Sequence, residues 1–315
     1  MEKIIKGTSL KYLSSGLGYH GDGIGSIRQN THDGDTIKVY DSGNISIRFL
    51  GIDTAEISFE INSSGKFIST GNQEWEDYLG DIENRWSGME SELGINLKEN
   101  IINRIKDRKP AENHNYYAKL AEDYLENLIK MEMEKLEQTK ENFKFFLPLA
   151  YELFDGYGRL LAFVHPDDKI NKPESFNQAL LAGGVALPYF IWPNVNPFRK
   201  KATVSEAAFN NPDDFRSFTN ADQSLQKART DIKKARQDKT GVFSENGPGP
   251  LILDAFELRY LSRQKAPYRW FIDLDAEDSI LHHPCEYFRF LPEDRLFIPE
   301  HFVPLFASRG WMKSV

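Results

Sequence analysis

Residues 33–56 read DGDTIKVYDSGNISIRFLGIDTAE. Apolar residues alternate with polar ones on both sides of the turn-forming run at 41–44, a pattern typical of two antiparallel strands. The segment therefore predicts a hairpin over 36–50. Ile45, Ile47 and Phe49 share one face of its second strand, so we expect Arg48 to point the other way.

Acidic residues lie at both ends of this hairpin. Asp35 precedes it, and Asp53 and Glu56 follow it. Asp35, Asp53 and the backbone carbonyl of Thr54 are hard oxygen ligands, a set that suits Ca²⁺, with Mg²⁺ as the other candidate. Glu56 then stands where a general base or a water-orienting group is needed.

A second predicted hairpin carries another arginine. The apolar stretch 143–154 leads into the turn dipeptide Asp155-Gly156, and Arg159 begins the run that returns. Attack on a phosphodiester adds negative charge to its non-bridging oxygens, to which a guanidinium group offers paired donors. Arg48 and Arg159 together therefore predict phosphate binding and stabilisation of the transition state.

Each of these residues also has a purely structural interpretation. Asp33-Gly34-Asp35 is compatible with a simple turn, Asp53-Thr54 with a strand-end cap, and Arg48 with an ordinary surface arginine. Their joint order favours a site over three unrelated coincidences.

The rest of the chain alternates between periodic and aperiodic segments. An amphipathic helix is predicted where Tyr117, Leu120, Ala121, Tyr124, Leu128 and Met131 recur at helical spacing, and further helices over 175–182 and around 225–240. Residues 57–110 lose any period, as expected of an insertion. The last 65 or so residues are dense in aromatics and predict an appended element with its own small core.

The motifs in this order resemble the staphylococcal nuclease family. They are Asp33-Gly34-Asp35-Thr36, Arg48, Asp53-Thr54-x-Glu56, Tyr157-Gly158-Arg159 and Asn177-Gln178-Ala179-Leu180. The resemblance covers roughly residues 30–56 and 113–244. It implies an α+β fold with a five-stranded OB-fold β-barrel and packed helices over 31–244, a large helical or loop insertion at about 57–112 and another at 198–220. Residues 1–30 would then be an N-terminal extension and 245–315 a C-terminal extension.

The resemblance also implies an activity. It predicts a Ca²⁺-dependent nuclease, an endonuclease of DNA or RNA that leaves 3′-phosphate and 5′-hydroxyl ends. Carried over residue by residue, the catalytic groups are Arg48, Glu56 and Arg159, and the metal ligands are Asp35, Asp53 and Thr54. Tyr157 and Tyr189 match positions that contact the substrate's terminal phosphate and its sugar or base.

Departures from the family pattern weaken the expected binding. Ala55 stands where a proline is usual, Gly156 where a lysine is usual, and Ile191 where a second aromatic would stack on a base. A net charge of −8 argues against a broad basic face for duplex DNA, so we expect a preference for single strands. Two alternatives stay open: a catalytically weak nucleic-acid- or protein-binding module, and a phosphodiesterase of small nucleotides.

Membrane insertion is not expected. No apolar run approaches the ~20 residues that span a bilayer, and no signal segment is visible near Met1. By default, this predicts a cytoplasmic protein.

Overall fold

The computed structural model describes residues 12–17, 19–20, 23–24, 31–41, 43–86, 93–168 and 170–314. Its strands are β1 (Tyr12–Leu17), β2 (Tyr19–His20), β3 (Gly23–Ile24), β4 (Thr31–His32), β5 (Thr36–Asp41), β6 (Gly43–Phe49), β7 (Gly51–Asp53), β8 (Ser58–Glu60), β9 (Phe67–Ser69), β10 (Lys144–Phe154), β11 (Leu160–Ala162), β12 (His165–Pro166), β13 (Leu187–Ile191), β14 (Trp270–Asp273), β15 (Ile280–Leu281), β16 (Arg295–Ile298) and β17 (Met312–Lys313).

The helices lie mainly between and after these strands. They are α3 (Gln73–Gly80), α4 (Ile82–Arg85), α6 (Ile95–Ile105), α7 (Pro110–Lys135), α8 (Phe176–Ala182), α9 (Val204–Ala208), α10 (Pro212–Ala221), α11 (Gln223–Gln237), α12 (Ala255–Ser262) and α13 (Val303–Ser308). Short 3₁₀ turns are η1 (Phe198–Lys200), η2 (Gly241–Phe243), η3 (Pro284–Arg289), η4 (Pro292–Asp294) and η5 (Glu300–Phe302). None of the described helices is both long and apolar enough to cross a membrane.

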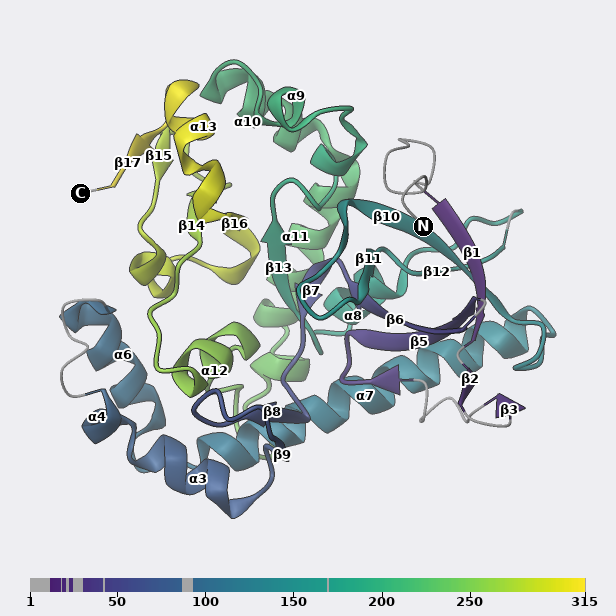
Figure 1. Cartoon of the computed structure of the whole chain (residues 1–315), viewed down its shortest axis with the longest axis horizontal. Helices are drawn as coiled ribbons and strands as arrows, with labels where there is room; N and C mark the ends of the chain where they lie inside the picture. Colours follow the sequence, from purple (N-terminus) through teal and green to yellow (C-terminus); the bar gives the residue numbers. More distant parts are fainter. Residues whose placement is uncertain are drawn as a thin grey trace.

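The larger sheet is built from the two predicted hairpins. Its order is β1-β10-β11-β6-β5-β4, with β12 beside β10, and β11 runs parallel to β6. Figure 1 shows this sheet curling over the long helix α7. The α+β class is confirmed, but the sheet is a half-barrel rather than the closed barrel we predicted. β1 also returns to β5, but through only two residue pairs, so the two sides of the sheet meet over a short length.

Two predicted helices form as expected. The side chain of Ser175 caps α8 by accepting the N–H of Gln178, and α8 ends at Gly183. α11 buries Leu225, Ala228, Ile232 and Ala235 on one stripe. In α7 the stripe is rotated from our prediction: Met131 is exposed, whereas Leu125 and Ile129 are buried in the core.

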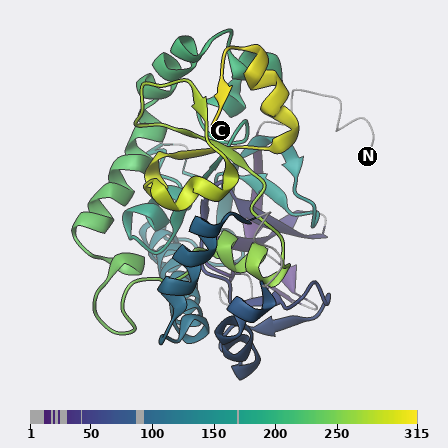
Figure 2. The same cartoon turned by 90° about the vertical axis from the view of Figure 1, so that its left-hand side faces the viewer.

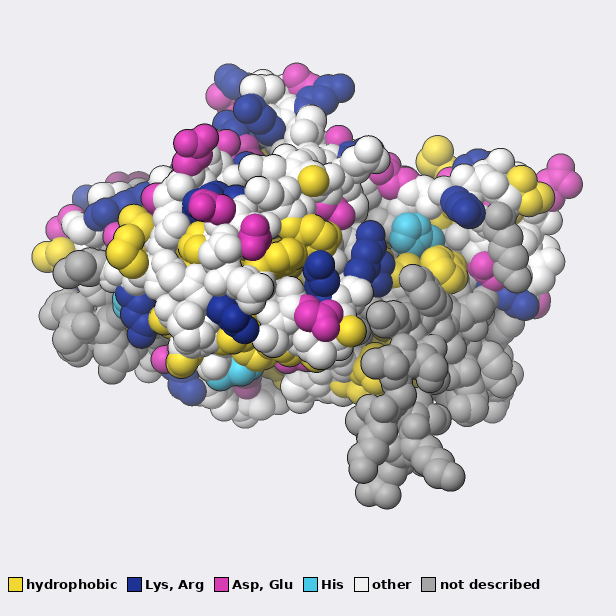
Figure 3. Space-filling model, turned by 90° about the horizontal axis from the view of Figure 1, so that it is seen from above, with side chains coloured by type: hydrophobic (Ala, Val, Ile, Leu, Met, Phe, Trp, Pro, Cys, Tyr) yellow, Lys and Arg dark blue, Asp and Glu magenta, His cyan; other side chains and the backbone are white. Residues whose placement is uncertain are grey.

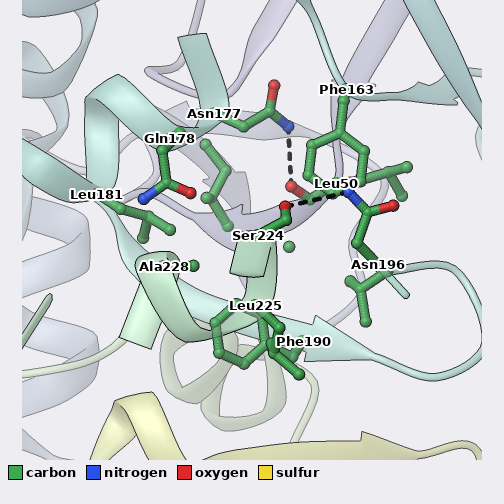
Figure 4. A pocket seen from close by; sticks show the side chains of 13 residues that line it. Leu50, Phe163, Asn177, Gln178, Leu181, Phe190, Asn196, Ser224, Leu225 and Ala228 are labelled. Atoms are coloured by element: carbon green, nitrogen blue, oxygen red, sulfur yellow. Dashed lines mark hydrogen bonds between the residues drawn. The ribbon is translucent and has the colours of Figure 1, made fainter. Parts of the chain in front are cut away.

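Asn177 joins α8 to the sheet. Its Oδ1 accepts the N–H of Val164 at 2.8 Å, and its Nδ2 donates to the carbonyl of Leu50 at 2.8 Å. Figure 4 shows this amide beside a small pocket of about 20 Å³, large enough for roughly one water. Asn177 therefore fixes the backbone just before β7, and its role is structural.

A second, four-stranded sheet connects the central fold to the C-terminal part. Its order is β14-β16-β13-β7, and β13 pairs antiparallel with β7 so that Leu187 lies opposite Asp53. C-terminal strands thus continue the sheet that carries Asp53.

The irregular insertion and the C-terminal part share one apolar core. Trp75, Tyr78 and Leu97 from the first pack in the same cluster as Leu258 and Phe271 from the second. In Figure 2, α6 lies beside α12, and the side chain of Arg104 in α6 donates to Glu257 in α12 at 2.5 Å. This differs from our expectation of a C-terminal element with a core of its own.

Two arginines on the outer face of α11 form ion pairs with the C-terminal part. Arg229 pairs with Asp294 at 2.6 Å and Arg236 with Glu293 at 2.5 Å. These guanidinium groups hold the C-terminal part against α11. The predicted division into domains and extensions stays a prediction, although β1 lies in the stretch expected to precede the domain.

Candidate active site

Arg48 forms ion pairs with two of the predicted acids. It lies in β6 opposite Thr36 of β5, and its Nη1 is 2.5 Å from Asp35 Oδ2, while its Nη2 donates to Asp53 Oδ1. Both carboxylates are almost fully buried. Burial alone would lower the pKa of Arg48, but the charges of Asp35 and Asp53 outweigh it and raise that pKa. The three side chains therefore form one buried, ion-paired group.

The loop that carries Asp35 is held tightly from several sides. Its carbonyl accepts the N–H of Phe49 at 3.0 Å, and its Oδ2 accepts the N–H of Thr54 at 3.2 Å. Gly34 packs against α7 so closely that a methyl group on it would lie 2.3 Å from Cβ of Ala121. Only glycine fits there without moving the helix or the loop.

His114 of α7 fixes the backbone of Glu56. Its Nε2 accepts the N–H of Glu56 at 2.8 Å, and its Nδ1 lies 3.1 Å from the carbonyl of Leu253. This arrangement requires a neutral ring with the proton on Nδ1. Burial lowers the pKa of His114 to about 4, in keeping with that form. No local pattern indicates this contact, because a single histidine in a long helix has many possible roles.

Arg259 of α12 completes the centre from the C-terminal part. Its Nη2 is 2.6 Å from Asp53 Oδ2, and its Nη1 lies 3.0 Å from Asp53 Oδ1 and 2.6 Å from Glu56 Oε1. Burial would raise the pKa of Asp53, yet Arg259 and then Arg48 hold it below its ordinary value. For Glu56, burial prevails over Arg259, with help from the charges of Asp35 and Asp53, and its pKa is raised.

A cleft of about 990 Å³ opens onto this centre. Arg48, Glu56 and Arg259 line its inner part, and Arg159, Arg263 and Arg269 lie on its walls. Aromatic side chains at its mouth are strongly exposed: Phe67, Phe154, Tyr157 and Tyr268. Its volume lies at the upper end of the range for ligand sites.

The predicted site residues fall into two groups. Asp35, Arg48 and Asp53 meet directly in the buried centre, Glu56 joins them through Arg259, and Thr54 contributes its N–H. Arg159, Tyr157 and Tyr189 line the same cleft. Tyr189 also borders the centre, because the guanidinium of Arg259 lies over its ring, 5.8 Å from the ring centroid.

Each member of the second group has a local partner. Arg159 Nε donates to Asp155 at 2.7 Å, and the hydroxyl of Tyr157 accepts from Arg263 at 2.7 Å. Tyr189 is buried, stacks on Phe256, and accepts from Arg269 at 2.7 Å. Its burial leaves little of the ring for a base to stack on.

A family model matches part of the chain. Residues 98–210 match the model of the staphylococcal nuclease homologue family. The match confirms the predicted resemblance and covers about a third of the chain. Of the predicted site residues it contains Tyr157, Arg159 and Tyr189, whereas the four that meet in the buried centre precede it. No curated protein matches the chain.

The resemblance to staphylococcal nuclease implies a metal, and the donor set can be tested against it. Ca²⁺ requires six to eight oxygen ligands at about 2.3–2.6 Å. Here guanidinium nitrogens already lie against Asp35 Oδ2, both Asp53 oxygens and Glu56 Oε1. Among the described residues no group of three or more His, Cys, Asp or Glu side chains is arranged to hold a metal ion. In this arrangement the acids do not fit the predicted ion.

We expect His114 to make the protein sensitive to mild acid. Its pKa of about 4 in the folded protein lies below its ordinary value of 6.5, so the unfolded chain binds a proton first as the pH falls. The free energy of unfolding should therefore fall by about 3 kcal/mol from this residue between pH 7 and pH 4. Urea denaturation at a series of pH values measures it.

The control for this titration is His114→Gln, which keeps an acceptor but has no proton to gain. Asp254 titrates in the same range, because burial and the charge of Glu257 raise its pKa to about 6. Since Asp254 is present in both proteins, their difference isolates His114. Identical pH dependence of the two proteins would contradict the assignment.

Proposed function

We propose that this protein binds single-stranded nucleic acid in the arginine-lined cleft and hydrolyses its phosphodiester bonds. The observation that carries the proposal is the meeting of Arg48, Asp35, Asp53 and Glu56 in one centre that opens onto the cleft. The match to staphylococcal nuclease homologues supports a nuclease or a nucleic-acid-binding module in general.

The chemistry of the cleft suits a single strand. Guanidinium groups bind phosphate oxygens through paired, charge-assisted hydrogen bonds, and exposed aromatic rings stack on unpaired bases. Gly156 leaves open space on the wall where the family usually has a lysine, and Arg263 and Arg269 provide positive charge nearby. On the face drawn in Figure 3, Lys and Arg alternate with Asp and Glu rather than forming a broad basic patch. Local charge within the cleft is therefore the basis of the proposed binding.

The proposed hydrolysis uses the side chains of the chain itself. Glu56 accepts a proton from water, the water oxygen bonds to phosphorus, and the bond from phosphorus to the 5′ oxygen breaks. The 5′ oxygen takes a proton from solvent, which leaves 5′-hydroxyl and 3′-phosphate ends. Arg48 and Arg159 would stabilise the charge that develops on the phosphoryl oxygens.

A second candidate function is a nucleic-acid-binding module without catalysis. The specific observation in its favour is that Arg259 already pairs with Glu56, the proposed base. A carboxylate oxygen that already accepts a hydrogen bond from a guanidinium group is less available to take a proton from water.

A binding and cleavage assay distinguishes these functions. Labelled single-stranded DNA and RNA, a duplex and dinucleotides are incubated with the full chain in Ca²⁺, Mg²⁺ or chelator, and the ends of the products are analysed. Cleavage of single strands to 3′-phosphate ends supports the proposal. Binding without cleavage in every metal supports the module, and activity confined to dinucleotides indicates a phosphodiesterase of small nucleotides.

Arg159→Ala tests the cleft in the same assay. We expect roughly tenfold weaker binding of single strands, and a salt dependence shallower by about 0.7 in slope, because one phosphate contact is lost. Arg289→Ala is the matched control, since Arg289 is half exposed, pairs with Glu286 and lies outside the cleft lining. Equal effects of the two substitutions would contradict the placement of substrate in the cleft.

A further inference from the structure

Arg259 occupies the positions around the acids that a bound cation would need. Its two terminal nitrogens reach both oxygens of Asp53 and one oxygen of Glu56, at 2.6–3.0 Å. An ion ligated by the same oxygens would sit about 2.3–2.6 Å from them, in space that the guanidinium fills. Arg48 also contacts Asp35 Oδ2 and Asp53 Oδ1.

The helix that carries Arg259 is firmly anchored. Asp254 and Glu257 form a capping box at the start of α12. Glu257 is fully buried and accepts hydrogen bonds from Arg104 and from the hydroxyl of Tyr287, both at 2.5 Å. Leu258 and Leu261 are fully buried on either side of Arg259. The guanidinium is therefore held by a packed helix and is a fixed part of the centre.

The negative charge of the centre also explains why a second arginine is present. Asp35, Asp53 and Glu56 lie together and are nearly excluded from water, so Arg48 alone would leave them undercompensated. A second fixed cation solves the same electrostatic problem that a divalent ion solves in an open carboxylate site. The planar fork of arginine suits this task, because it satisfies two carboxylates at once.

We propose that Arg259 takes the place of the divalent cation, so that the centre meets phosphate with guanidinium groups and has no Ca²⁺ site of its own. In this assignment Asp53 holds two arginines in position rather than a metal. The inference rests on the proposed function, because it says how the proposed site binds phosphate. Its test needs no nucleic acid.

The test is calorimetric titration of the full chain with CaCl₂. We expect no saturable Ca²⁺ binding by the wild-type protein at millimolar concentrations. Arg259→Met frees the oxygens of Asp53 and Glu56 and should bind Ca²⁺ at least tenfold more tightly than wild type. It should also gain thermal stability when Ca²⁺ is added. Arg263→Met, one helical turn further on and also at the cleft, should bind Ca²⁺ no more tightly than wild type does.

Wild-type binding of one Ca²⁺ with an affinity that Arg259→Met leaves unchanged would overturn the inference. Should Arg259→Met fail to fold, the wild-type protein still decides it. Binding of one Ca²⁺ to wild type that Asp53→Asn abolishes would overturn it, and absence of any such binding supports it. Because cleavage is not measured, failure of the proposed nuclease activity leaves these outcomes unaffected.

Discussion

Replacing Glu56 with glutamine is expected to lower the rate of phosphodiester cleavage by roughly 10²- to 10⁴-fold, the usual contribution of a general base. Glutamine keeps an oxygen that can accept from Arg259 and preserves the shape of the centre. It cannot accept a proton from water. Single-turnover cleavage of a labelled single strand measures the effect, and binding of that strand should change little.

The pH dependence of cleavage gives an independent sign of the same role. The pKa of Glu56 is raised above its ordinary value of 4.5, mainly by burial, so the wild-type rate should fall as the pH drops through that raised pKa. Any residual activity of Glu56→Gln should not show this fall in rate at low pH. Glu152→Gln is the control, because Glu152 lines the cleft but bonds to Asn194. A wild-type rate in Glu56→Gln would show that Glu56 holds Arg259 and does nothing more.

Replacing Arg48 with methionine is expected to destabilise the protein by about 3–5 kcal/mol, the usual cost of removing one partner of a buried ion pair. Asp35 and Asp53 would lose a shared cation while remaining almost fully buried. Phosphate binding at the centre should be lost with it. Urea denaturation gives the change in free energy of unfolding.

A surface pair serves as the comparison for Arg48. Arg85 lies 3.3 Å from Asp81 within one helical turn, and both side chains are partly exposed. Arg85→Met should cost under about 1 kcal/mol. Arg48→Lys should fall between the two, because it keeps the charge but not the paired geometry. Equal destabilisation by Arg48→Met and Arg85→Met would contradict the buried centre.

The parts of the fold that were predicted correctly depend on local signals. Both hairpins follow from alternation and turn chemistry within about 20 residues, and α8 follows from the cap at Ser175 and the stop at Gly183. That Asp35, Arg48, Asp53 and Glu56 lie together could also be predicted from the sequence. All four lie in one stretch of 22 residues around a single hairpin.

The missed parts depend on contacts between distant residues. Arg259 meets Glu56 across 203 positions of sequence, and His114 meets it across 58. No periodicity in either segment signals such a contact. Residues 57–110 read as irregular, yet they contain α3, α4 and α6. These short helices bury Trp75, Tyr78 and Leu97 against other segments, so tertiary packing decides their structure more than a local pattern does.

The shared core of the insertion and the C-terminal part limits how the protein can be dissected. A chain ended at residue 244 would keep every catalytic residue that the family resemblance implies, and would look complete by sequence. It would also expose the apolar faces of α3 and α6 to water and leave Asp53 and Glu56 without Arg259. Such a fragment is therefore prone to aggregate, and a failed assay on it would carry no information about the whole protein.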